Sequence, residues 1–253
     1  MTETLTDSPS KNQLDFPQVF AMFLHPRKAF EVIAASARST WQTPMLLLSL
    51  SGVLSVVVSG FFTARAASMG VTPLPTDFQY WTPEMQSNYN QAQQAMSGST
   101  FVYIIPLVGA LTMLWLGWLA LSGLLHLTST LLGGRGSMGG ALNIVAWASL
   151  PFALRDVLRI LFMLISQRAI ASPGLSGFAS GSGFWAQLLS HLDVFLIWQA
   201  LLLAVGFFLA DGLSRNKAIA GVLIILLLVL SAQAGLGALA ANLGGMAVQR
   251  PFF

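Results

Sequence analysis

Five long apolar stretches, separated by polar connections, run through the sequence. The first extends from Pro44 to Phe62 without a charged residue, and Trp41 stands just before it. The other four cover residues 101–132, 138–165, 194–210 and 218–239. A helix needs about 20 apolar residues to cross the hydrocarbon core of a bilayer. The pattern therefore predicts an all-α integral membrane protein, built as a five-helix transmembrane bundle.

A different pattern precedes the first stretch. Apolar side chains recur there at the spacing of one helix face, namely at Phe16, Val19, Phe20, Phe23 and Leu24. Pro26 interrupts this helix and can open a second one at its first position. The second helix carries Phe30 and Ile33 on one side and basic residues among its polar positions.

Helices of this kind lie at the headgroup boundary, where basic side chains meet anionic lipid. Residues 16–37 are therefore expected to form N-terminal interfacial amphipathic helices that do not span the membrane. The alternative is that their apolar face packs under the bundle, and the two arrangements are compatible.

Two connections stand out by their length. Residues 63–100 are rich in Gln, Asn, Ser and Pro, and inside them Thr82, Pro83 and Glu84 provide a helix cap, a first-turn proline and a first-turn acid. They predict a short amphipathic helix lying on the bundle. Residues 166–183 form a Ser/Gly-rich loop.

Composition supports the membrane assignment. Of the 253 residues, 55% are apolar and only 8% are charged, whereas soluble domains carry about 25% charged residues. So few charges cannot cover a globule in water, which excludes a soluble enzyme, a disordered chain and a nucleic-acid binder. The net charge of +3 is too small to form a basic patch for nucleic acid.

The sequence offers few groups for metal or cofactor chemistry. Cysteine is absent, which removes thiolate nucleophiles and sulfur ligands. The three histidines, His25, His126 and His191, are not spaced as a ligand pair. We therefore expect neither a metal nor a cofactor.

Lys and Arg in the connections set the orientation of a membrane protein. With five spans, the N-terminal side of the membrane collects seven basic residues: Lys11, Arg27, Lys28, Arg38, Arg135, Arg215 and Lys217. The opposite side collects Arg65, Arg168 and Arg250. The bias predicts a cytoplasmic N-terminus.

Arg155, Asp156 and Arg159 interrupt the third apolar stretch and form a candidate intramembrane charged group. If the helix begins near Met138, Arg155 lies about 25 Å along it, near the far interface, where arginine can snorkel. A structural anchor is the favoured interpretation, with Arg159 as the nearest partner for Asp156 in sequence. The alternative is a proton relay or ion path, the default hypothesis for ionisable groups inside a bilayer.

One short string resembles a catalytic motif. Gly174-Leu175-Ser176-Gly177 matches the string around the nucleophile of intramembrane serine proteases, and His191 follows it. Ser176, however, comes directly after a proline-containing, Gly-rich stretch, and strings this short match by accident. The sequence favours a turn, predicts no catalytic residue and indicates that the protein is not an enzyme.

Small residues recur near the end of the last stretch. Gly237, Ala241 and Gly245 stand at i, i+4 and i+8, and such a stripe lets helices approach closely in lipid. It is a candidate helix-packing stripe, for the bundle itself or for self-association.

Three stretches together resemble the Ypt-interacting-protein (Yip) domain family of five-span membrane proteins. They are MFLHPRKAFEVI with the following Trp41 and TPMLLL, then LLGGRGSMGGALNIVAWASLP from Leu131 to Pro151, and LDVFLIWQALLLAVGFFLADGLSRNKA from Leu192 to Ala218. The resemblance covers roughly residues 17–235, and the chain is most similar to compact bacterial members. It implies a helical bundle with a cytoplasmic N-terminus.

Eukaryotic relatives bind Rab-type GTPases and act in membrane traffic. This chain departs from them because it lacks their long acidic or proline-rich N-terminal region, which makes GTPase binding doubtful. The expected division is a flexible polar tail at residues 1–15, a single Yip-like membrane domain at 16–245 and a short C-terminal tail at 246–253.

Two functions from different classes follow. The favoured hypothesis is a non-enzymatic membrane scaffold or partner protein, with a role in membrane organisation or trafficking. Its expected partners are the lipid bilayer and other membrane proteins or further copies of itself, in a bacterial inner membrane. The alternative is a small oligomeric transporter or channel-like protein, which the charged group beside Pro151 supports. A water-filled cavity reaching Asp156 would favour transport, and a dry bundle would favour the scaffold.

Overall fold

The computed structural model describes residues 14–36, 39–70, 74–75, 77–170, 172–179 and 183–247, with side chains to residue 242. All secondary structure in this part of the chain is helical. Most of the two expected tails, residues 1–15 and 246–253, lies outside it. The α-helices are α1 (Phe16–Leu24), α2 (Pro26–Ala35), α3 (Gln42–Ser68), α4 (Pro83–Met96), α5 (Ile105–Leu131), α6 (Met138–Ala148), α7 (Leu150–Ser166), α8 (Phe184–His191), α9 (Val194–Asp211) and α10 (Arg215–Ala247). Three short helices accompany them, η1 (Phe78–Tyr80), the π-helical η2 (Thr100–Ile104) and η3 (Ser176–Phe178).

Four of the described helices are long and apolar enough to cross a membrane. They are α3, the continuous run Thr100–Leu131 of η2 and α5, α9, and residues Arg215–Asn242 of α10. They coincide with the first, second, fourth and fifth apolar stretches. The third stretch is not one long helix, because it is divided between α6 and α7.

The division between α6 and α7 has a local cause. Pro151 has no N–H to donate to the carbonyl four residues back, and its ring disfavours a helical conformation in the residue before it. Ser149, at the break, donates its hydroxyl to the Val145 carbonyl at 2.7 Å. The buried Gln199 of α9 donates to the same hydroxyl at 2.9 Å. A neighbouring helix therefore supplies a polar partner where the backbone ladder is interrupted.

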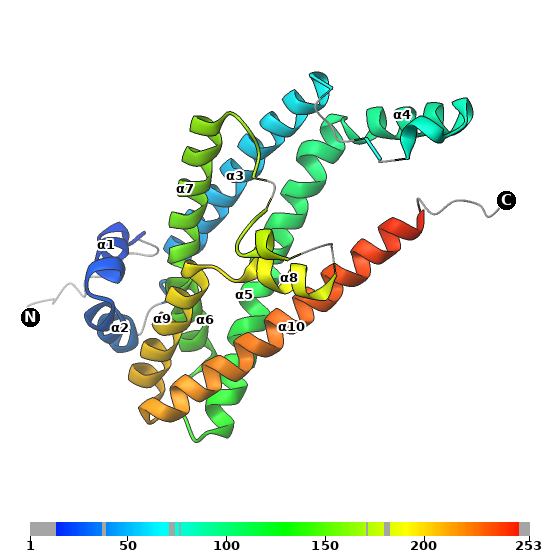
Figure 1. Cartoon of the computed structure of the whole chain (residues 1–253). Coiled ribbons are helices and arrows are strands. Elements are labelled where there is room, and N and C mark those ends of the chain that lie inside the picture. Colours follow the sequence, from blue (N-terminus) through cyan, green and yellow to red (C-terminus); the bar gives the residue numbers. More distant parts are fainter. Residues whose placement is uncertain are drawn as a thin grey trace, which may run out of the picture.

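Figure 1 shows how the helices are arranged. Helix α7 runs along α3, α5 packs against α6, and α10 crosses the bundle obliquely in contact with α5, α8 and α9. The pair α1–α2 lies at one edge, where α2 packs on α9 and α6. The segment after α7 turns back toward the middle of the bundle, so that α8 and the start of α9 lie beside α10 and α7.

Helix α6 forms the centre of the core, and polar contacts tie it to the start of α3. Residues 143–148 of α6 are buried without interruption. The Asn143 side-chain oxygen accepts hydrogen bonds from the backbone N–H groups of Thr40 and Trp41, both at 3.0 Å. The fully buried Trp147 donates its indole N–H to the Thr40 hydroxyl at 3.0 Å. These contacts fix where the first spanning helix begins.

The N-terminal helices face two environments. Met22, Phe30 and Ile33 are buried against the bundle. Phe20 and Leu24, two members of the α1 stripe, are 71% and 72% exposed. Part of the apolar surface of α1 therefore packs on the protein, and the rest faces outward.

Helix α4 begins as the sequence predicts, but it does not lie on the bundle. The Thr82 hydroxyl accepts a hydrogen bond from the backbone N–H of Met85 at 3.3 Å and caps the helix. The helix has no buried residue, and it extends outward from the start of α5, touching the bundle at η2 (Figure 1). The expectation that this helix lies on the bundle was wrong, because its polar side chains offer little apolar surface to pack.

Gly206 of α9 marks a close helix crossing that predicts a stability difference. A Cβ at this position would lie 2.5 Å from Ile144 Cγ2 and 3.1 Å from the Phe30 ring. Gly206→Val should therefore lower the free energy of unfolding in detergent by about 1–3 kcal/mol, since the buried crossing cannot expand without strain. Gly117→Val is the matched control, because nothing lies within 4 Å of a Cβ at Gly117. Equal losses in the two variants, measured by thermal unfolding, would contradict the crossing.

Candidate functional site

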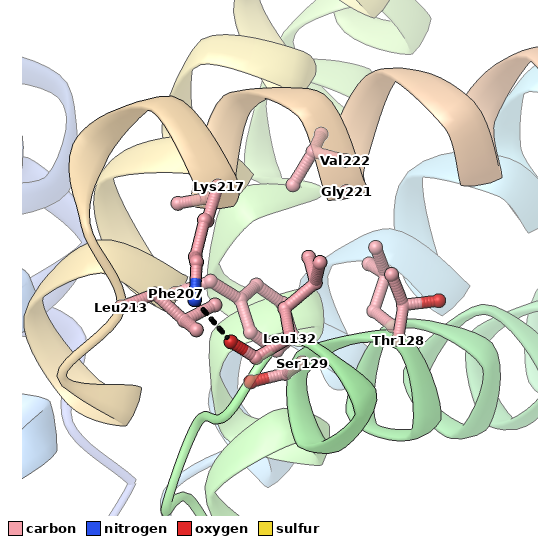
Figure 2. A pocket seen from close by; sticks show the side chains of 10 residues that line it. Thr128, Ser129, Leu132, Phe207, Leu213, Lys217, Gly221 and Val222 are labelled. Atoms are coloured by element: carbon pink, nitrogen blue, oxygen red, sulfur yellow. Dashed lines mark hydrogen bonds between the residues drawn. The ribbon is translucent and has the colours of Figure 1, made fainter.

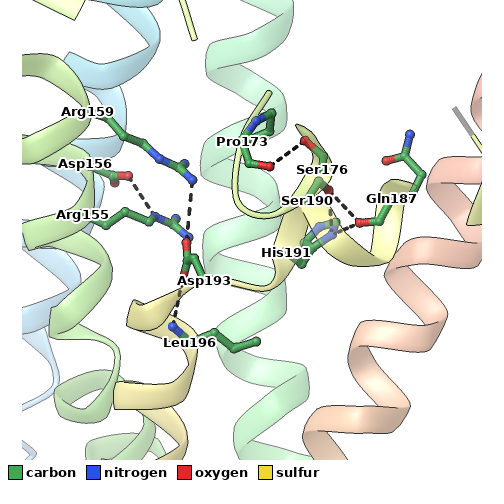
Figure 3. Close-up of polar contacts among 10 residues, drawn as sticks. All are labelled: Arg155, Asp156, Arg159, Pro173, Ser176, Gln187, Ser190, His191, Asp193 and Leu196. Atoms are coloured by element: carbon green, nitrogen blue, oxygen red, sulfur yellow. Dashed lines mark hydrogen bonds and ion pairs between the residues drawn. The ribbon is translucent and has the colours of Figure 1, made fainter. Parts of the chain in front are cut away.

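Four charged side chains meet inside the bundle, and we call them the charged cluster. Arg155, Asp156 and Arg159 project from α7, and Asp193 stands at the start of α9 (Figure 3). Their side chains are between 13% and 28% exposed. The sequence placed three of these residues together, and the fold adds the fourth.

Asp193 is the acceptor on which two arginines converge. Its Oδ2 lies 3.4 Å from Arg155 Nη1 and 3.8 Å from Arg159 Nη2. Its other oxygen, Oδ1, accepts the backbone N–H of Leu196 at 2.9 Å and so caps α9. One carboxylate therefore starts α9 and ties it to α7.

Asp156 has a different set of partners from the one expected. Its Oδ1 lies 3.7 Å from Arg155 Nε, and its Oδ2 accepts the Ser51 hydroxyl of α3 at 3.3 Å. Arg159, the partner predicted from spacing, makes its ion pair with Asp193 instead. The cluster therefore joins three helices, α3, α7 and α9.

The charges of the cluster balance, since two guanidinium groups face two carboxylates. The Arg155 guanidinium also lies over the Phe152 ring, 4.5 Å from its centroid, a cation–π contact that stabilises a cation away from water. A neutral, internally paired group is far less costly in an apolar bundle than separate charges. The arrangement fits a structural clasp between helices.

The cluster lies between helices rather than at the end of one. Helix α7 continues ten residues beyond Asp156, to Ser166, which is about 15 Å of further helix. At that end Gln167 accepts a hydrogen bond from Arg65 at 2.9 Å, close to the end of α3. The apolar stretch therefore continues past Arg155, which was expected near the far membrane interface.

The sequence contained a signal for Asp193 but none for Ser51. Asp193 directly precedes a long apolar helix, the position where Asp caps a helix N-terminus, yet its position does not reveal which helix lies opposite. Ser51 is one of several serines in α3 and is distinguished only by its neighbour in space. Both contacts join residues far apart in the chain.

The protease-like string forms a packed turn. Ser176 donates its hydroxyl to the Pro173 carbonyl at 2.7 Å, and His191 Nδ1 lies 2.8 Å from the Gln187 carbonyl (Figure 3). Gly174 has φ +59°, and a Cβ there would lie 2.6–2.9 Å from three carbonyl oxygens around the end of α8. The glycine of the string is needed for packing and for its backbone conformation.

A third carboxylate, more deeply buried than the two of the charged cluster, holds the turn between α5 and α6. Asp211, 4% exposed at the end of α9, accepts a hydrogen bond from the Ser129 hydroxyl. Its backbone carbonyl accepts the Arg135 N–H at 3.0 Å. Lys217 donates to the Leu132 carbonyl at 2.8 Å, beside a small hollow of about 10 Å³ (Figure 2). These contacts close one end of the bundle and leave little space there.

The small-residue stripe of α10 makes at least one contact within the chain. A Cβ on Gly237 would lie 2.9 Å from Gln187 Oε1 of α8. Ala241 is half-buried, and the side-chain environment of Gly245 lies outside the described residues. Gly237 therefore lets α8 approach α10, which is the bundle-packing interpretation of the stripe.

Neither of the two described cavities is lined by the charged cluster. The small hollow lies between α5 and α10, and a larger cavity of about 370 Å³ lies between α3 and the start of α5. Within the described residues, no three His, Asp or Glu side chains gather as metal ligands.

Comparison with known proteins gives one match. The sequence matches the family model of the Yip1 domain over residues 20–236, a range that begins inside α1 and ends inside α10. No curated protein and no solved structure gives a significant match. The matched range takes in α2 to α9 completely and parts of α1 and α10.

The two roles of Asp193 can be separated by substitution. Asp193→Ala removes both the helix cap and the partner of two arginines, whereas Asp193→Asn keeps an acceptor for the cap. Asp193→Ala should therefore destabilise the protein by about 1 kcal/mol more than Asp193→Asn. Thermal unfolding in detergent measures both.

Asp156→Asn is the matched comparison for these variants. It leaves Asp193 in place to face both arginines and keeps an oxygen for the Ser51 hydroxyl, so it should cost less than Asp193→Ala, although the two guanidinium groups then share one carboxylate. A larger loss for Asp156→Asn than for Asp193→Ala would contradict the central place of Asp193.

Proposed function

The chain belongs to the Yip1 domain family, and from this we propose that it is a non-enzymatic membrane scaffold that binds other membrane proteins or further copies of itself. Its role is membrane organisation of a trafficking-like kind, in a bacterial inner membrane. The observation that carries the proposal is the pairing of the charged cluster. The charges that a transport path would need are engaged with one another across α3, α7 and α9.

The outer surface supports a role in association. Helix α7 presents a row of exposed apolar side chains, Leu154, Val157, Leu158, Leu161, Phe162 and Ile165. In a bilayer such a face meets lipid or another apolar helix. Helices associate there mainly through close van der Waals packing of complementary surfaces. Helix α4 extends beyond the bundle and offers Gln and Asn side chains on the surface.

We retain the five-span topology within this proposal. Helices α6 and α7 together cover residues 138–166 with one break, about 40 Å if nearly continuous, which is enough to cross a bilayer. The Lys and Arg bias then places the N-terminus in the cytoplasm. The outward-facing Phe20 and Leu24 support placing α1 and α2 at the headgroup boundary.

A second function has a specific observation in its favour. Helix α6 ends and α7 begins inside the bundle, and α9 begins there too, at the charged cluster. Broken helices whose ends meet charges are a device of transporters. The same geometry would allow an ion-coupled transporter or channel if water reached Asp156.

Photocrosslinking tests the scaffold directly. A photoreactive residue in place of Phe162, which is 48% exposed, should give discrete adducts with another membrane protein or a second copy in native membranes. Met163, the next residue and 2% exposed, is the matched control and should give none. Identical patterns at the two positions would count against a defined partner surface.

A flux assay in vesicles decides between the scaffold and the transporter. The scaffold predicts no proton-dependent ion flux from the reconstituted wild type. A proton-dependent flux that is present in the wild type and lost in a stably folded Asp156→Asn variant would overturn the scaffold and establish the transporter.

The topology can be tested with single cysteines, because the sequence contains none of its own. Ser97→Cys, after α4, should react with a membrane-impermeant maleimide from outside intact spheroplasts. Ser214→Cys, between α9 and α10, should react only after permeabilisation. The reverse result would contradict a cytoplasmic N-terminus, and labelling of both from outside would contradict five spans.

The same approach places the N-terminal helices. A polarity-sensitive label on Phe20→Cys should report an apolar environment in vesicles that contain anionic lipid. Lys28→Cys, on the exposed side of α2, is the control and should report water. A watery environment at both positions would place these helices off the membrane.

A further inference from the structure

The larger cavity has two walls of different chemistry. It lies between α3 and the start of α5 and has a volume of about 370 Å³, comparable to about twelve water molecules in the liquid. One wall carries the hydroxyl groups of Ser55, Ser59 and Thr63, and the other is apolar, with Met96, Phe101 and Pro106. No charged residue lines it.

The hydroxyl wall has unused hydrogen-bonding capacity. Ser55, Ser59 and Thr63 stand at i, i+4 and i+8, so they follow one another along one side of α3. The Thr63 hydroxyl donates to the Ser59 carbonyl at 2.9 Å. The hydroxyls of Ser55 and Ser59 have no hydrogen-bond partner among the described residues. Polar groups in a bilayer are costly unless they are satisfied, which indicates that something else satisfies them.

The opposite wall is irregular where it meets the cavity. The N–H of Ile105 bonds to the Thr100 carbonyl in the π-helical pattern of η2. In that pattern the next bond would run from residue 106 to the Phe101 carbonyl. Residue 106 is a proline and has no N–H, so the pattern supplies no donor to this carbonyl. Short π-helical segments are frequent at functional sites.

Position along the helices narrows the chemistry of the occupant. Apart from Met96 at the end of α4, the lining residues belong to two candidate membrane-spanning helices, so we infer that the opening between these helices faces lipid. Thr63 and Ser55 lie five and thirteen residues before the end of α3 at Ser68, or about 8 and 20 Å along it. A glycerolipid in one leaflet has its ester groups and the first part of its acyl chains across this depth.

We propose that this cavity binds one glycerophospholipid, with an ester carbonyl accepting hydrogen bonds from the α3 hydroxyls and an acyl chain against the apolar wall. Hydroxyl donors fit ester oxygens, which only accept hydrogen bonds. The absence of charge among the lining residues means that the site holds the uncharged part of the lipid rather than selecting its headgroup. The proposal depends on the membrane location and is independent of the scaffold.

Native mass spectrometry of the detergent-purified protein tests this. The wild type, reconstituted with palmitoyl-oleoyl phosphatidylethanolamine and returned to detergent, should retain one lipid per chain, identified by its mass. Ser59→Phe fills the cavity and should abolish retention. Leu54→Phe, at a neighbouring position that is 48% exposed, is the matched control and should retain the lipid.

A second variant removes the hydroxyls without filling the space. Ser55→Ala with Ser59→Ala should leave about ten-fold fewer lipid-bound molecules, as expected for the loss of two hydrogen bonds, with an unchanged thermal midpoint. The proposal is overturned if the wild type retains no phospholipid, if it retains a free fatty acid instead, or if the serine double variant retains as much lipid as the wild type. The comparison of the wild type with the serine double variant tests lipid binding even if Ser59→Phe does not fold.

Discussion

A bilayer core contains no water to satisfy buried polar groups, and most of the buried polar side chains in the described part of this chain are hydrogen-bonded within the protein. The effect is clearest around α6, the most buried helix. Asn143 and Trp147 hold the start of α3, and Gln199 bonds to Ser149 where the chain between α6 and α7 is interrupted. These contacts set the register of three helices, and the apolar surfaces pack around them.

The side chains of the charged cluster are also paired with one another. Pairing matters more here, because an unpaired buried charge costs far more free energy than an unpaired hydroxyl. Asp193 starts α9 and receives two arginines of α7, while Asp156 turns to Ser51 of α3. The break between α6 and α7 lies beside Pro151, and α7 packs along α3. The charged cluster could serve as an ion path if water reached it. Because its side chains pair with one another, it fits a structural link between helices, and this favours the scaffold within the Yip1 domain family.

Glycine residues also hold the bundle together, because they let its segments approach closely. Gly206 lets α9 meet α6 and α2, Gly174 lets the loop after α7 meet the end of α8, and Gly237 lets α8 meet α10. In lipid, close approach of this kind replaces the hydrophobic driving force that would hold helices together in water. The cavity between α3 and α5 is the contrasting case, where hydroxyl groups remain open to a lipid.

The sequence alone determined the membrane class, the helical fold and the approximate ends of four long helices, because apolar length and periodicity are local properties of the chain. The cap at Thr82 and the resemblance to the family were also present in it. The tertiary structure alone decided that α4 extends from the bundle, that Arg159 pairs with Asp193, and that the charged cluster lies between helices. Those outcomes depend on which residues of distant segments meet, and neither hydropathy nor spacing within one helix carries that information.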